Sequence, residues 1–126
     1  MKKEFLLAGS AFFFLAVFSS CFRSHEISVY ESDSEDEYRI KINYKKDQTH
    51  TVRLFLDEHL KNHIVSFKNA AVDREIILDD NTEVYINSRP GRLRIKIDKT
   101  ENSEESCERI KVVCEEIKAI LEENDF

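Results

Sequence analysis

A change in hydrophobic period divides most of this chain into two kinds of structure. From Tyr38 to Asp98, apolar residues recur mainly at every second position between turn residues, as in strands with one buried face. From Cys107 to Leu121 they recur at spacings of three and four, as on one face of a helix. These apolar surfaces become buried when the two pack together. The sequence therefore predicts an α+β domain, an antiparallel β-meander of about five to seven short strands with one C-terminal helix packed on one face.

Turn residues separate the expected strands. A polar break at 46–48 has hairpin length, so we expect 38–45 and 49–56 to form an antiparallel hairpin. Pro90 and Gly91 have the residue types of the two central positions of a type II turn. The strands expected from the alternation are 26–30, 38–45, 49–56, 75–78, 83–87 and 92–98.

The segment 57–73 is compatible with two structures. Its apolar residues are spaced by three and four positions, which would place them on one face of a helix. The stretch 64–67 is instead β-branched and aromatic, and could form a short strand after a turn at 61–63. We favour the turn and the strand.

The first residues of the chain have the layout of an export signal. Two lysines precede an apolar run from Phe5 to Phe18, and two serines then lead to Cys21. The segment 15–21, Leu-Ala-Val-Phe-Ser-Ser-Cys, resembles the lipobox of bacterial lipoproteins, with Phe18 where that family usually has an aliphatic residue. The resemblance implies that Cys21 is lipidated and becomes the first residue of the mature protein.

Two other fates of this segment remain open. Cleavage near Ser19 or Ser20 would give a free exported protein. An uncleaved segment 5–22 would instead be an anchor close to the lower limit of roughly 17 to 25 residues that a membrane-spanning helix needs. Each alternative exports the domain. We expect a location in the bacterial cell envelope, lipid-anchored to a membrane through Cys21 and facing the periplasm or the cell surface.

Removal of the signal leaves enough chain for one domain. We expect an export signal at 1–20, a lipidated N-terminus and acidic tether at 21–37, and a single α+β domain at 38–126. The run from Glu31 to Glu37 is acidic and serine-rich, as in solvated tethers. Calcium binding is the alternative, although the run lacks the glycine and the spacing of an EF-hand loop. The formal net charge of −6 argues against nucleic acid as a partner.

Cys107 and Cys114 lie seven residues apart in the predicted helix. Their α-carbons would be about 10.5 Å apart, beyond the roughly 7 Å limit for a disulfide. We expect two free, buried thiols on the core face of the helix. An intermolecular disulfide is the alternative. The cysteines also lack the paired spacing of a zinc site.

Catalytic and metal-binding patterns are weak. On a helix, His59 and His63 would share a face and could ligate a metal, but no third ligand is evident and we expect surface histidines. The chain has no Gly-x-Ser-x-Gly elbow, and its many carboxylates lie in solvated runs. We therefore expect no enzyme activity, no cofactor and no metal.

The outward positions of the predicted strands carry many cations. They would form a basic face on an acidic molecule, suited to an acidic protein or a carboxylate-bearing polymer. The alternative is that lysine and arginine only keep an open sheet face soluble. The candidate interface consists of Arg39, Lys41, Arg53, Phe55, Tyr85, Arg92, Arg94 and Lys96.

These patterns favour a small, exported, non-catalytic module that binds a protein or takes part in envelope assembly. The first alternative is a periplasmic inhibitor or immunity-type protein that neutralises a toxin or hydrolase. The second is a metal- or small-ligand-binding protein that uses His59 and His63.

Overall fold

A computed structural model describes residues 23–24 and 27–124. The predicted signal segment and Cys21 lie outside the described residues. In chain order the elements are β1 (Arg23–Ser24), β2 (Ile27–Asp33), β3 (Glu37–Asn43), the 3₁₀ turn η1 (Lys46–Gln48), α2 (Thr49–His59), β4 (Val72–Ile77), β5 (Glu83–Arg89), β6 (Arg92–Asp98) and α3 (Glu104–Glu123).

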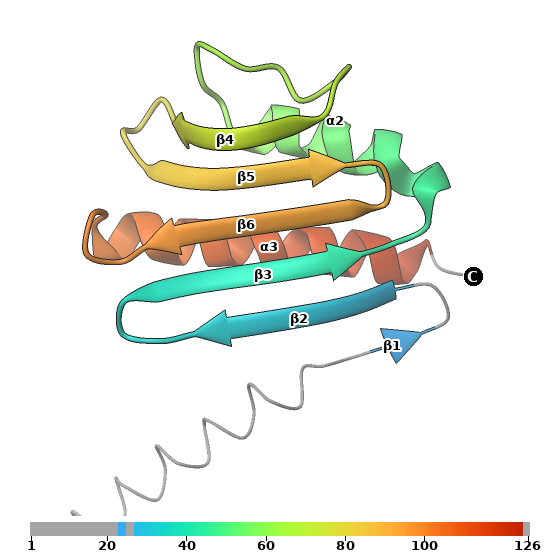
Figure 1. The fold of residues 1–126 in the computed structure, drawn as a ribbon, viewed down its shortest axis with the longest axis horizontal. Helices are drawn as coiled ribbons and strands as arrows, with labels where there is room; N and C mark the ends of the chain where they lie inside the picture. The colour runs from blue at the N-terminus through green and yellow to red at the C-terminus, as the bar shows by residue number, and fades with distance from the viewer. Residues whose placement is uncertain (1–22, 25–26, 125–126) are drawn as a thin grey trace, which may run out of the picture.

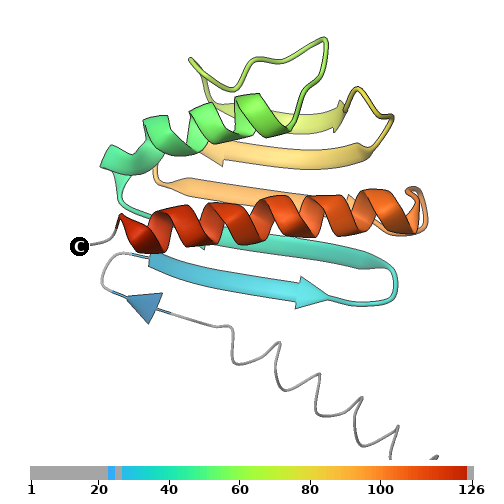
Figure 2. The ribbon, with the colours of Figure 1, turned by 180° about the vertical axis from the view of Figure 1, so that it is seen from behind.

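All described strands belong to one antiparallel sheet with the order β1-β2-β3-β6-β5-β4 (Figure 1). The hairpin β2-β3 comes first, α2 then carries the chain to the far edge, and β4, β5 and β6 return until β6 pairs with β3. Both helices lie on the same face of the sheet (Figure 2). The α+β class, the antiparallel sheet and the C-terminal helix are confirmed, while the strand order departs from a simple meander at the β3-β6 junction.

The hydrophobic core lies between the sheet and the two helices. Every second residue of β3 and β6 points into it, and α3 contributes the buried stripe Cys107, Ile110, Val113, Cys114, Ile117 and Leu121. The side chain of Ser103 caps α3 by accepting a hydrogen bond of 3.0 Å from the Ser106 N–H. Both thiols are free and buried, as predicted. Burial raises the pKa of Cys114 to about 12, so this thiol stays protonated at neutral pH.

The turn between β5 and β6 has the predicted residues at its centre. Gly91 has φ +75°, the left-handed value that a type II turn requires at its third position. A β-carbon at Gly91 would also lie 3.1 Å from the carbonyl oxygen of Tyr44. Glycine is therefore required here for both conformation and space.

The predicted strand at 49–56 is wrong, because these residues form α2. The apolar alternation at 52, 54 and 56 contains a pair four residues apart, Val52 and Leu56, which fits a helix equally well. Both of these side chains are buried, whereas Leu54 between them is exposed. The expected hairpin of 38–45 with 49–56 therefore does not form, and two helices cover the sheet instead of one.

The favoured strand at 64–67 is also wrong, because residues 60–71 form a loop. Side-chain oxygens accept hydrogen bonds from backbone N–H groups that would otherwise pair with a neighbouring strand. Asn62 Oδ1 accepts from the backbone N–H groups of Ile64 and Val65, and Asp57 Oδ1 accepts from that of Phe67 at 3.0 Å. The Phe67 side chain is fully buried, so the loop is packed onto the core.

The acidic segment Glu31 to Glu37 is not a tether. Its first residues belong to β2, which pairs with β3 from Ser28 to Asp33, and Glu37 begins β3. The alternation continues through this segment, because Glu31 and Asp33 occupy inward positions beside lysines of α3. The folded domain therefore begins before Tyr38.

Candidate interface on the open sheet face

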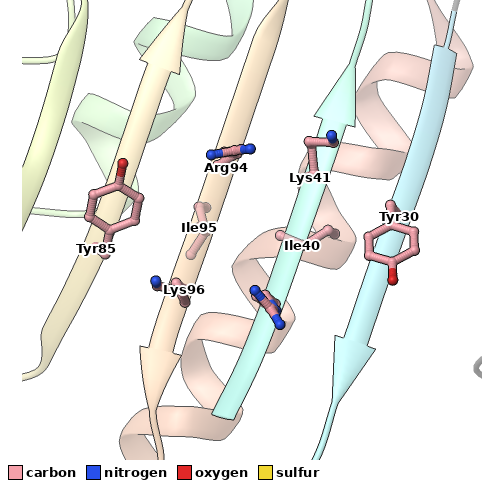
Figure 3. A pocket seen from close by; sticks show the side chains of 8 residues that line it. Tyr30, Ile40, Lys41, Tyr85, Arg94, Ile95 and Lys96 are labelled. Atoms are coloured by element: carbon pink, nitrogen blue, oxygen red, sulfur yellow. The ribbon is translucent and has the colours of Figure 1, made fainter.

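The pairing of β3 with β6 places five cations together on the face that the helices leave open. Arg39 lies opposite Lys96 and Lys41 opposite Arg94, while Arg92 lies opposite Asn43. The residues between them point into the core, so the cations all point outward. Figure 3 shows this face. We call these five residues the basic ladder: Arg39, Lys41, Arg92, Arg94 and Lys96.

The ladder contains like charges in directly opposite positions. Arg39–Lys96 and Lys41–Arg94 are such pairs, and Arg89 of β5 lies opposite Arg92 in the same way. Like charges directly opposite on one sheet face destabilise the pairing of the strands. The same face also carries carboxylates, with Glu37 opposite Asp98 at one end of the two strands. The arrangement favours an anionic ligand that neutralises the ladder.

Little of this charge is neutralised within the described residues. Arg39 lies 3.7 Å from Glu37, an ion pair between an exposed and a half-buried side chain. In the part of the chain that the structure describes, Lys41, Arg92 and Arg94 have no carboxylate within 4.0 Å. These three cations are available to a partner.

Two tyrosines border the ladder. Tyr30 of β2 and Tyr85 of β5 flank a shallow depression of about 180 Å³ whose floor is the strand backbone at Ile40 and Ile95 (Figure 3). The Tyr85 hydroxyl donates to Asp73, and the Lys96 Nζ lies 5.3 Å from the centroid of the Tyr85 ring. Tyr85 is thereby fixed, whereas the Tyr30 side chain is 62% exposed. The depression is smaller than the roughly 300 to 1,000 Å³ of typical small-molecule sites.

Two predicted interface residues do not lie on this face. Arg53 and Phe55 belong to α2, on the opposite side of the sheet. Phe55 stacks on His59 with ring centroids 3.9 Å apart, and it packs partly buried against the core. The other six predicted residues lie on the open face. Sequence reasoning expected a strand at 26–30 but left Tyr30 out of the interface, because it assigned the acidic residues that follow to a tether.

The two histidines proposed as a metal pair are separated by the end of α2. His59 is the last residue of that helix, and His63 lies in the following loop with its Nε2 3.2 Å from Asp79 Oδ1. The two imidazoles therefore do not share a helix face. Among residues 23–24 and 27–124, no group of three or more His, Cys, Asp or Glu side chains could hold a metal ion.

Ion pairs on the inner face fix the position of α3. Lys118 Nζ lies 3.1 Å from Glu31 Oε1, and the side chains are only 15% and 14% exposed. The buried Tyr38 hydroxyl donates to the other oxygen of Glu31. Nearby, Lys111 Nζ lies 2.7 Å from Asp33 Oδ2. Lysines of α3 are thus directed toward the sheet, and glutamates remain on the outer face of the helix.

Acidification should weaken this contact. Burial by itself would raise the pKa of Asp33, but hydrogen bonds and charges from Lys111 and Lys99 outweigh it and lower the pKa. Because the folded pKa lies below the unfolded one, the stabilisation is complete above about pH 4 and is lost as the pH falls below it. Asp33→Asn should cost about 2 kcal/mol at pH 7 and flatten the acid side of the stability profile.

Urea unfolding at pH 7, 5 and 3 tests this prediction. The matched control is Asp47→Asn, which alters an exposed carboxylate in η1. Equal pH profiles for the two variants would contradict a stabilising role for Asp33.

Comparisons with protein-family models, with curated proteins and with solved structures find no match. Of the helices that the structure describes, none has both the length and the apolar character needed to cross a membrane.

Proposed function

We propose that this protein is a non-catalytic binding or assembly module of the bacterial cell envelope, held to a membrane by lipid at Cys21. It engages an anionic protein surface through the open sheet face. The observation that carries the proposal is the set of opposed like charges in the basic ladder, which lie on the open face and have no carboxylate partner among the described residues at Lys41, Arg92 and Arg94.

The shape of the face supports recognition of a surface over enclosure of a small molecule. The ladder lies on the open face of the sheet, and the depression between Tyr30 and Tyr85 is small, about 180 Å³. Tyrosine and arginine are enriched among residues that dominate binding energy in protein interfaces. A partner with carboxylates would meet cations that steer its approach, and salt would weaken its binding.

Affinity capture from gently solubilised native membranes tests this function. The full-length chain is compared with the double variant Lys41→Glu/Arg94→Glu. The matched control, Lys61→Glu/Lys68→Glu, makes the same charge change at exposed residues of the 60–71 loop. The native chain and the control should recover one dominant partner, and the ladder variant should recover at least about tenfold less.

Equal recovery by all three chains, or no partner with the native chain, would contradict the proposal. A captured toxin or hydrolase would instead favour the inhibitor-type alternative. A parallel Cys21→Ala chain tests the anchor, because it should leave the membrane fraction if lipid at Cys21 holds the protein there.

A further inference from the structure

The helix layer presents the opposite charge to the sheet face. Within α3, the exposed cation Arg109 pairs with Asp80, while Lys111 and Lys118 contact acids of β2. The remaining exposed charges of α3 are all carboxylates. We call them the acidic ridge: Glu104, Glu105, Glu108, Glu115, Glu116, Glu122 and Glu123.

The ridge and the ladder lie back to back across the domain. Lys118 contacts Glu31 on β2, and Glu31 lies beside Ile40, which in turn lies beside Ile95. The C-terminal half of α3 therefore passes behind the strands that carry the ladder, as Figures 1 and 2 show. A second copy shifted along the normal of the sheet would bring its acidic ridge over the basic ladder without rotation.

We propose that the open sheet face of one copy receives α3 of a second copy, so that copies associate head to tail. This inference rests on the proposed function and names a second copy of the chain as the anionic partner. The contact would also cover two exposed apolar side chains, Tyr30 on the sheet face and Val112 on α3, which are 62% and 52% exposed. In this contact the cations of the basic ladder lie against the carboxylates of the acidic ridge, whereas each copy alone holds like charges close together on either surface.

The size of the face sets the strength of the contact. The five longer strands, each of six or seven residues and about 4.8 Å apart, cover roughly 24 by 23 Å, or roughly 550 Å² in plan. This is small beside the roughly 800 Å² per partner of standard stable interfaces, so association in dilute solution is weak. Attachment of all copies to one membrane raises their effective concentration.

The contact joins two different surfaces and can therefore repeat. A ridge on a ladder leaves each end of the pair free to bind a further copy, which gives open chains and not closed dimers. The described fold begins with β1 beside β2, at one edge of the sheet. Copies stacked along the sheet normal would all present this edge on the same side, which suits anchoring to one membrane.

Zero-length carbodiimide cross-linking of the full-length chain in phosphatidylcholine vesicles tests the inference. The reagent joins a lysine amine to a carboxylate that contacts it. Lys41 and Lys96 lie on the opposite side of the sheet from α3, so an amide between either lysine and the acidic ridge can form only between copies. We expect a series of dimers, trimers and larger species, suppressed by high salt, with Lys41 or Lys96 joined to ridge glutamates.

Charge reversal makes the test specific. One variant is Lys41→Glu/Arg94→Glu on the ladder. The other is Glu116→Lys/Glu123→Lys on the ridge, where neither glutamate has an ion pair among the described residues. Each variant alone sets like charges against each other at the substituted positions and should lose the cross-linked series by at least about tenfold. In a mixture of the two variants, the altered ladder meets the altered ridge and the native ladder meets the native ridge, so that opposite charges face each other at both contacts. The mixture should therefore restore the cross-linked series, which a misfolded variant could not do.

Absence of the series in the native chain, or its persistence in both variants alone, would overturn the inference. The proposed function can be judged independently of this inference. If the native chain forms no oligomers but membrane capture still recovers another anionic protein that the ladder variant loses, head-to-tail association is wrong and the binding function stands.

Discussion

Replacement of Phe67 by alanine is expected to lower the free energy of unfolding by about 3 to 5 kcal/mol. Phe67 is fully buried although it lies in the 60–71 loop, and its removal deletes apolar contacts and leaves a cavity under that loop. A domain of this size has a total stability of roughly 5 to 15 kcal/mol, so the loss would leave little reserve. Urea unfolding followed by circular dichroism measures the change.

The same loop supplies the control for this prediction. Ile64 is 69% exposed, and Ile64→Ala should change the free energy of unfolding by less than about 0.5 kcal/mol. A Phe67→Ala effect as small as that of the control would show that the loop does not pack on the core in solution.

The second large effect concerns the contact between β2 and α3. Glu31→Ala would leave the Lys118 ammonium and the Tyr38 hydroxyl at a largely buried site without their shared partner. Because an uncompensated buried charge is costly, we expect a loss of about 3 kcal/mol. Lys118 keeps a contact of 2.8 Å with Glu115, which limits the damage.

Two further variants separate charge from hydrogen bonding in this contact. Glu31→Gln keeps an acceptor for Tyr38 and should cost about 1 to 2 kcal/mol. The double variant Glu31→Leu/Lys118→Met removes both charges, and replacing an ion pair by apolar groups is often close to neutral. If the double variant is less stable than Glu31→Ala, the ion pair contributes more than its desolvation costs, and our account of this site is wrong.

Local sequence patterns determined much of the fold but not its topology. The helix at 104–123 was predictable, because its apolar stripe and its capping serine lie within one continuous segment. The segment 49–56 was not, because three alternating apolar residues match a strand and a helix equally well, and packing against the sheet decides between them. The pairing of β3 with β6 joins strands far apart in the sequence, which no local pattern can show.

In the candidate interface, too, local sequence patterns predicted some residues correctly and others wrongly. Arg92, Arg94 and Lys96 were predictable, because they alternate with buried residues inside one clear strand. Arg53 and Phe55 depended on the mistaken strand at 49–56. The end of β2, from Glu31 to Asp33, was mistaken for a tether because its inward charges, Glu31 and Asp33, have their partners on α3 and Lys99.

These inward charges also bear on the behaviour of the sheet edge. The short strand β1 pairs with only Ile27 and Ser28 of β2, so within the described residues the rest of that edge has no neighbouring strand. Exposed edges are templates for aggregation. An apolar strand arriving there would have to place its side chains beside Glu31 and Asp33. A slip of β2 by one residue would turn both acids toward solvent and separate them from their lysines. The charges therefore hold the register of β2 and discourage foreign strands, which protects the domain while it folds.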